Sequence, residues 1–280
     1  MFLYSIASAP SVTTVEGHSY PVDESTNVPS SILSRIPFKL HEKPSHPLHI
    51  LRSLIHSAFP SDFQVIAPSS PVVSVYQNFD ELGFPPDHPG RAATDSYYLN
   101  KEHMLRTHTS AHEVDVFKRG AEKWLLSAEV YRRDEIDRSH YPVFHQMEGA
   151  YVLPRDQIQE TMQAENEHLE KRLELALAQG RLLIKDDTQS GTEANPWQES
   201  HDQKSAEIVA RSLKLHLNHL VLSLFGPAQK DQSEPLKIRW LEDAFPFTSP
   251  SYQMEVFYDG RWLEIFGSGV VKQYTLDQAG

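Results

Sequence analysis

The segment 130–149, VYRRDEIDRSHYPVFHQMEG, constrains the fold of this chain more than any other. Its two flanks alternate in polarity and are rich in β-forming residues, and residues 134–142 between them are polar. This pattern predicts two strands of an antiparallel pair joined by a loop. The pairing would hold Arg132 near Gln146 and Glu148. An arginine suits a phosphate and a carboxylate accepts from an ammonium group, although a surface salt bridge is the commoner meaning of such a pair.

The remaining sequence alternates between helix-forming and strand-forming patterns. Asp259-Gly260 separates two of the strand patterns and is typical of a hairpin turn. The sequence therefore predicts an α+β fold, an antiparallel sheet with helices packed on it. Helices are expected at 46–59, from Thr109 or Ser110 to about 119, at 156–178 and around 202–225, and strands at 71–79, 97–100, 238–243, 252–258 and 261–267.

Stretches rich in proline, glycine or polar residues predict the connections. Loops are expected at 83–91 and 227–235, and a flexible polar insertion at 180–200. Residues 1–30 are expected to form an extended, weakly ordered lead-in.

Composition excludes several classes of function. The chain has no cysteine, which removes disulfides, thiolate metal sites and cysteine nucleophiles. Its formal charge of −12 argues against a broad nucleic-acid-binding surface. No apolar run approaches the roughly 20 residues of a membrane span.

A histidine group raises the alternative of a metal enzyme. His108 and His112 are four residues apart, and His103 is close in sequence. The phrase HTSAH nevertheless lacks the glutamate that follows the first histidine in HExxH. Isolated surface or packed histidines are the preferred interpretation.

The segment 130–149 resembles motif 2 of class II aminoacyl-tRNA synthetases, in the form found in phenylalanyl-tRNA synthetases of the single-chain mitochondrial type. In that family an arginine grips the ATP α-phosphate and the amino-acid carboxylate, and a loop with its phenylalanine holds the adenine. The resemblance implies that Arg132 is the phosphate ligand, that Phe144 stacks on adenine, that Ser139, His140 and Tyr141 occupy the ATP loop, and that Gln146 and Glu148 hold the substrate's amino group.

Two further phrases extend the resemblance to the amino-acid pocket. RTHTSAH implies that Ser110 and His112 contact the amino acid and its carbonyl region, with Arg106 in support. FPFTSP implies that Phe245 and Phe247 pack against the phenyl ring of the substrate, although core packing is the better interpretation of an ordinary phenylalanine pair.

The phrase RWLEIFGSGV implies a place near ATP. Glu264 stands within an apolar strand pattern, where a carboxylate is costly to bury without a partner. In an unknown chain it would be an outward-facing strand residue. The resemblance implies that Glu264 helps to hold ATP and its Mg²⁺, with Glu255 as a weaker candidate.

The resemblance implies a phenylalanine–tRNA ligase. Phenylalanine and ATP would form phenylalanyl-adenylate, and the phenylalanyl group would pass to tRNA(Phe) in the mitochondrial matrix. The chain is expected to be a monomer without a membrane segment. Met1 to Thr14 lacks acidic residues, as a transit peptide does, but also lacks the usual positive charge.

Residues 31–280 would form the catalytic domain, without the family's motif 3 and anticodon-binding domain. We therefore expect little or no activity from the 280-residue chain alone. A non-catalytic synthetase-like protein that binds phenylalanine or a partner is the alternative.

Overall fold

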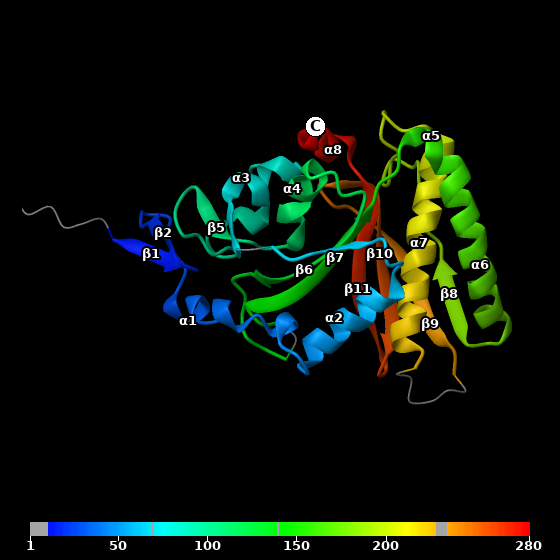
Figure 1. Cartoon of the computed structure of the whole chain (residues 1–280), viewed down its shortest axis with the longest axis horizontal. Coiled ribbons are helices and arrows are strands. Elements are labelled where there is room, and N and C mark those ends of the chain that lie inside the picture. The colour runs from blue at the N-terminus through cyan, green and yellow to red at the C-terminus, as the bar shows by residue number, and fades with distance from the viewer. Residues whose placement is uncertain (1–10, 69, 139, 228–233) are drawn as a thin grey trace, which may run out of the picture. The chain divides into compact units, whose positions relative to one another are not determined.

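The computed structural model describes residues 11–68, 70–138, 140–227 and 234–280 (Figure 1). The chain folds into two compact units, and each unit is assembled from three separate segments. The first unit comprises Met1–Ile50, Val65–Val116 and Leu125–Gly149, and the second comprises Leu51–Gln64, Phe117–Trp124 and Ala150–Gly280.

The first unit opens with a two-stranded antiparallel hairpin, where an extended lead-in was expected. β1 (Val12–Val15) pairs with β2 (His18–Pro21). Gly17 adopts a φ of 86° in the connecting turn, a value that favours glycine. Three short helical turns follow, namely α1 (Ser30–Leu33), η1 (Ile36–Phe38) and η2 (Leu40–Glu42). α1 and η1 contribute Ile32 and Ile36 to a core that also contains Val15, Tyr97, Leu99, Leu105 and Tyr131.

The strand predicted at 71–79 is wrong beyond Ser74. β4 (Val72–Ser74) is followed directly by a helical turn, α3 (Val75–Asn78). Ser74 and Gln77 form a capping box, because the Ser74 side chain accepts from the Gln77 backbone while the Gln77 side chain accepts from the Ser74 backbone. This local cap outweighs the β-forming valines on either side of it.

The strand predicted at 97–100 lies a few residues later, since β4 pairs with β5 (His103–Leu105). An isolated bridge joins Tyr98 to Met104. The loop predicted at 83–91 is preceded by one short turn, η3 (Asp80–Leu82), and ends in another, η4 (Pro89–Arg91). The helix predicted from Thr109 or Ser110 begins as a 3-10 turn, η5 (Thr109–His112), and continues as α4 (Glu113–Lys118).

The antiparallel pair predicted around the segment 130–149 is confirmed. β6 (Lys123–Tyr131) and β7 (Val143–Tyr151) lie side by side (Figure 1). β3 (Gln64–Ile66) pairs with the other edge of β6, which gives a three-stranded sheet. The Arg132 amide donates to the Pro142 carbonyl at 3.0 Å, and the Val152 amide donates to the Glu122 carbonyl at 2.7 Å. These bonds require that β6 and β7 run in opposite directions.

The second unit contains a four-stranded sheet in the order β11-β10-β9-β8. The three antiparallel strands predicted near the C-terminus are confirmed, and the turn between the last two is formed by Asp259 and Gly260 with φ values of 50° and 82°. Their bounds are Leu236–Asp243 for β9, Thr248–Tyr258 for β10 and Arg261–Val271 for β11.

The fourth strand lies within the polar stretch where a flexible insertion was expected. β8 (Leu182–Asp186) pairs in parallel with β9, so the sheet is mixed. Leu182 and Ile184 alternate toward the core, which explains why this short piece of a polar segment joins the sheet. A parallel pair requires a long connection between its strands, and the helix α7 (Gln203–Phe225) lies within that connection.

Helices cover one face of this sheet. The predicted long helices are confirmed, and α6 and α7 lie side by side (Figure 1). Side chains of β9 and β10 alternate into the core between sheet and helices, among them Ile238, Trp240, Met254 and Val256. The remaining helices are α2 (Pro47–Ala58), α5 (Arg155–Gln157), the π-helical turn η6 (Ile158–Met162), α6 (Gln163–Ala178) and α8 (Gln273–Ala279).

The architecture confirms an α+β fold. Among the described residues, none of the helices combines the length and the apolar character that a membrane crossing needs.

Candidate functional site

A buried hydroxyl and a carboxylate form the centre of the candidate site in the first unit. Ser110 belongs to the 3-10 turn η5, and Glu148 belongs to β7. The Ser110 hydroxyl donates to Glu148 Oε2 at 3.0 Å. Glu148 accepts this hydrogen bond from another element of the same unit. It is therefore more than one half of a surface salt bridge on the hairpin.

Acceptor oxygens gather around this pair. Gln146 lies two residues before Glu148, on the same face of β7. Within the described part of the chain, Gln146 Oε1 and Glu113 Oε2 are buried and have no hydrogen-bond donor. These oxygens lack hydrogen-bond donors among the described residues. A ligand with several N–H bonds, such as an ammonium ion, would supply them.

Burial controls the charge of the two carboxyl groups. It raises the pKa of Glu148 to about 7, against the lowering effect of the bonds from Thr109 and Ser110. It also raises the pKa of Glu113 well above its usual range, and the nearby Glu148 charge adds to the rise. Burial and the nearby Glu148 charge therefore both favour the neutral form of Glu113. The resemblance assigned no role to Glu113.

The side chain of His112 is bonded to a buried arginine, Arg106. Arg106, which is 1% exposed, donates from Nη1 to His112 Nε2 at 3.0 Å. Arginine has donors only, so Nε2 of His112 accepts and the proton of the neutral ring is on Nδ1. Arg106 also donates to Glu129 Oε1 at 2.8 Å and to the Ser70 carbonyl at 2.8 Å. Arg106 therefore fixes the orientation of the His112 ring.

Asn78 is a positioning residue that the sequence did not reveal. Its side chain exchanges two hydrogen bonds with Thr107, at 2.8 and 3.0 Å. Its carbonyl lies 2.9 Å from His108 Nε2. Asn78 thus fixes the turn before Ser110. It lies about 30 residues earlier in the sequence, in a helical turn where a strand was predicted.

Arg132 and Phe144 lie together at the loop end of the β6–β7 pair. The Arg132 guanidinium is 5.1 Å from the centre of the Phe144 ring, within cation–π range. Arg132 Nε donates to the Thr107 carbonyl at 2.9 Å. The arrangement orients an exposed cation beside an aromatic face, which is suitable for a phosphate next to a base.

The loop residues near Arg132 are more exposed. Both nitrogen–oxygen distances from His140 Nδ1 to the Asp137 carboxylate are about 3 Å, and this contact raises the pKa of His140. Tyr141 is 44% exposed. Ser139, the third loop residue, lies outside the described residues.

The second unit contains the two phenylalanines of the FPFTSP phrase. The rings of Phe245 and Phe247 are stacked, with centres 6.1 Å apart and planes at 20°. Phe245 lies against Gly267 of β11, where an added Cβ would come within 2.6 Å of the ring. The glycine therefore makes room for the ring. Both rings are partly exposed, in contrast to ordinary core packing.

Glu264 faces outward from β11, as its pattern in an unknown chain suggested. It lies beside Glu255 of β10 across the strands, and Glu255 accepts hydrogen bonds from Arg239 and Gln253. The face carries acidic and basic groups in contact with solvent. An exposed carboxylate is a suitable oxygen ligand for Mg²⁺, which keeps several waters and binds few protein groups.

The three neighbouring histidines do not form a metal centre. His108 is stacked on Phe84, with ring centres 5.4 Å apart, His112 is bonded to Arg106, and His103 lies 3.3 Å from Asn100 Oδ1. Burial, with help from Arg132, lowers the pKa of His108 to about 4. In the described ranges, these histidines are not among the residues that could jointly hold an ion.

Comparison with known proteins identifies the class. Residues 35–174 and 194–280 match the family "tRNA synthetases class II core domain (F)". The chain belongs to this family.

Individual relatives are more specific. The chain is 39% identical to phenylalanine–tRNA ligase, mitochondrial, of Saccharomyces cerevisiae, over 99% of this chain and 65% of the relative. It is 36% identical to the protein of the same name from Rattus norvegicus, over 99% of this chain and 56% of the relative. The chain thus spans between half and two thirds of the length of these relatives.

Proposed function

We propose that this chain is the amino-acid-activating part of a phenylalanine–tRNA ligase. The observation that carries the proposal is the acceptor-rich pocket of Ser110, Glu148, Gln146 and Glu113, in a region that matches the class II core family. The names of these two relatives, both phenylalanine–tRNA ligases, support the choice of amino acid.

Phenylalanine would bind by both of its ends. The ammonium group would donate to Glu148 and Gln146, and Ser110 and His112 would contact the carboxylate side of the molecule. Phe245 and Phe247 would pack against the phenyl ring, where edge-to-face contacts contribute about 0.5–1.5 kcal/mol beyond burial. A pocket without a polar partner disfavours the hydroxyl of tyrosine.

ATP would bind beside the amino acid. Arg132 would hold the α-phosphate, Phe144 would stack on the adenine, and Ser139, His140 and Tyr141 would line the loop around it. Glu264 would be an oxygen ligand of the Mg²⁺ that neutralises phosphate charge. The amino-acid carboxylate would attack the α-phosphorus and release pyrophosphate, with orientation and electrostatic stabilisation supplying the catalysis.

The second step defines the cellular setting. The adenylate would pass its phenylalanyl group to the terminal ribose of tRNA(Phe), in the mitochondrial matrix, a setting supported by the word mitochondrial in the relatives' names. Residues 31–280 would serve as one catalytic domain of a monomer. The formal charge of −12 supports tRNA contact over a restricted surface only.

Two measurements on the purified chain test the proposal. Calorimetric titration with phenylalanine should show binding that Glu148→Gln weakens, and ATP–pyrophosphate exchange should depend on phenylalanine. Arg132→Ala should lower exchange by about 100-fold or more, whereas the exposed Arg119→Ala control should not.

The outcomes separate the alternatives. Phenylalanine binding without exchange, from a chain with native circular dichroism, would favour the non-catalytic binding protein. Absence of both would show that the proposal is wrong.

A further inference from the structure

A second cluster of ionisable groups lies on the other face of the β6–β7 pair. Residues on a strand alternate between faces, so His145 projects away from the face that carries Phe144 and Gln146. Glu129 of β6 and His41 of the 3-10 turn η2 lie on this opposite face. All three belong to the first unit.

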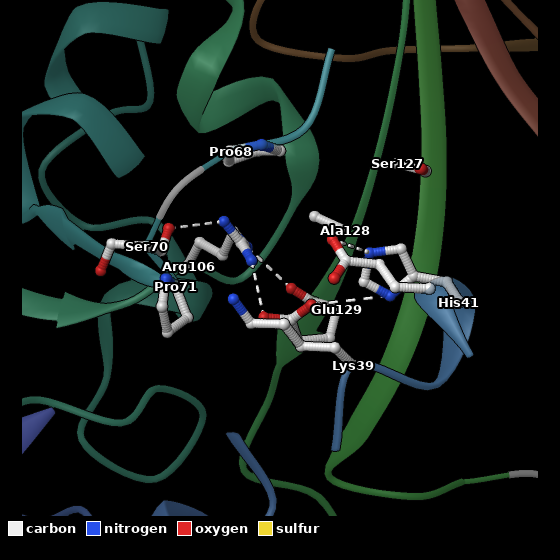
Figure 2. A pocket seen from close by; sticks show the side chains of 10 residues that line it. Lys39, His41, Pro68, Ser70, Pro71, Arg106, Ser127, Ala128 and Glu129 are labelled. Atoms are coloured by element: carbon white, nitrogen blue, oxygen red, sulfur yellow. Dashed lines mark hydrogen bonds and ion pairs between the residues drawn. The ribbon is translucent and has the colours of Figure 1, made fainter. Parts of the chain in front are cut away.

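The three side chains converge. Ligand atoms of His41, Glu129 and His145 lie within 4.8 Å of one another. His41 Nδ1 is 3.8 Å from Glu129 Oε2, and the His41 and His145 rings have centres 5.1 Å apart, tilted by 57°. His41 and Glu129 are 5% and 4% exposed. Figure 2 shows His41 and Glu129 turned toward each other in a small polar pocket, with Arg106 close to Glu129.

The separations are unlike those of a hydrogen-bonded ion pair. A charge-assisted N–H···O bond spans about 2.7–2.9 Å, and the His41–Glu129 separation is 3.8 Å. Two ligands held at about 2.0–2.2 Å from one tetrahedral ion are roughly 3.4 Å apart, which is closer to the observed value. His145 Nε2 is also buried and, within the described part of the chain, makes no hydrogen bond.

The surrounding charges favour a cation. Two basic groups, Lys39 and Arg106, lie close by, and each is paired with a carboxylate, Glu16 and Glu129. A third carboxylate, Glu42, lies 3.8 Å from His41 Nε2. Three carboxylates therefore lie around the cluster against two basic side chains.

Glu42 has the place of an outer-shell partner. In many metal sites, the ligating histidine donates its second N–H to a carboxylate, which fixes the tautomer. Nδ1 of His41 faces Glu129 and Nε2 faces Glu42, which at 3.8 Å needs a small shift to accept that second N–H.

We propose that His41, Glu129 and His145 bind a divalent transition-metal ion, with Zn²⁺ as the best match to two imidazoles and one carboxylate. The fourth position would be taken by water. The ion would join η2 to both strands of the hairpin, on the face opposite the phenylalanine and ATP residues. The metal site shares no ligand with the proposed phenylalanine and ATP residues, although Arg106 bonds to both Glu129 and His112.

The test uses the full chain, stripped of metal with a chelator and then dialysed. Titration with Zn²⁺ alone should show one ion per chain, and Co²⁺ should produce the intense visible absorption of a four-coordinate site. Loss of an outer-shell partner typically weakens metal binding by roughly 10- to 100-fold, and Glu42→Gln should have an effect of this size. His145→Gln and Glu129→Gln each remove a ligand and should weaken Zn²⁺ binding more than that. His18→Gln, an exposed histidine of the same unit, is the control.

His145→Gln decides the test, because Glu129→Gln also removes the partner of the buried Arg106 and disturbs folding. Circular dichroism confirms that each variant is folded. Zn²⁺ binding that His145→Gln leaves unchanged, that His18→Gln reduces equally, or that is absent from the folded chain would overturn the proposal.

Discussion

The charge of Glu148 determines how strongly the proposed pocket attracts an ammonium group. Only the ionised carboxylate attracts the cation. Since burial raises its pKa to about 7, Glu148 is partly protonated near neutral pH in the free protein. The raised pKa also means that folding favours the protonated form, so its contribution to stability is lost as pH rises through about 7.

The pKa of Glu148 predicts a pH dependence of phenylalanine binding. The KM for phenylalanine should be lowest near pH 8 and rise as pH falls below about 7, approaching tenfold per pH unit. Glu148→Gln should raise KM about 10- to 100-fold at pH 8 and remove this dependence. Exchange kinetics between pH 6 and 9 measure both effects. A KM independent of pH in the unaltered chain would contradict the assignment.

Glu113 should behave differently, although it is buried beside Glu148. Burial and the charge of Glu148 both raise its pKa well above the usual range and favour its neutral form. Glu113→Gln replaces a neutral carboxyl group by a neutral amide of the same shape. The KM for phenylalanine at pH 8 should therefore change by about twofold or less, and the free energy of unfolding by about 0.5 kcal/mol or less. A tenfold rise in KM would mean that Glu113 carries charge.

At the scale of elements, two glycines of β11 have different neighbours, so their replacement by alanine should have different effects. In Gly267→Ala, the new Cβ would meet the Phe245 ring, a side chain that is able to move. We expect a KM for phenylalanine about tenfold higher, with circular dichroism unchanged. Gly269→Ala would instead place a Cβ 2.5 Å from the Pro250 carbonyl, which should lower the free energy of unfolding by about 1–3 kcal/mol.

Denaturant unfolding and exchange kinetics on both variants make the comparison. A Gly267→Ala protein with an unchanged KM would show that Phe245 does not contact the phenyl ring of the substrate.

The capping box that starts α3 predicts a loss of stability. Ser74→Ala removes the acceptor for the Gln77 amide, at 3.0 Å, and should lower the free energy of unfolding by about 1 kcal/mol. Ser34→Ala, which removes only an exposed bond to a carbonyl three residues earlier, should change it by less than about 0.5 kcal/mol. Urea denaturation measures both. Equal changes in the free energy of unfolding for the two variants would mean that the capping box adds no stability of its own.

Elements with strong local signals were predictable from the sequence. The Asp259-Gly260 turn, the hairpin 130–149 and the long helices depend on periodicity and turn chemistry, which neighbouring residues encode. β8 and α3 were not predictable, since β8 is defined by pairing with β9 about 50 residues later and α3 by a cap of two side chains. In the site, Ser110 and Glu148 were identified through resemblance. Asn78 was not, because only the folded chain brings it to Thr107.

At the scale of the whole molecule, the two units depend differently on their separate segments. The main apolar cluster of the second unit has its buried members between residues 173 and 256, although Trp124 of the segment 117–124 is also buried. The short segments 51–64 and 117–124 contact the first residues of the last segment, where Val152 bonds to Glu122 and Tyr151 packs on Phe63 and Lys123.

We therefore expect the fragment 150–280 to fold alone. It should show helical and strand signals in circular dichroism and a cooperative urea transition. Trp240→Ala should abolish that transition, because it removes a 2% exposed side chain from the core. Gradual unfolding of the unaltered fragment would show that the two short segments are needed.

The interleaving of segments also sets an order of events during synthesis. Residue 149 completes the first unit, so its hairpin is able to form while the ribosome is still adding the second unit. Residues 51–64 and 117–124 leave the ribosome before the segment they belong with. The growing chain must keep these two stretches, including the apolar face of α2, away from other chains until residues 150–152 emerge. Chaperone dependence of the nascent chain should peak in that interval.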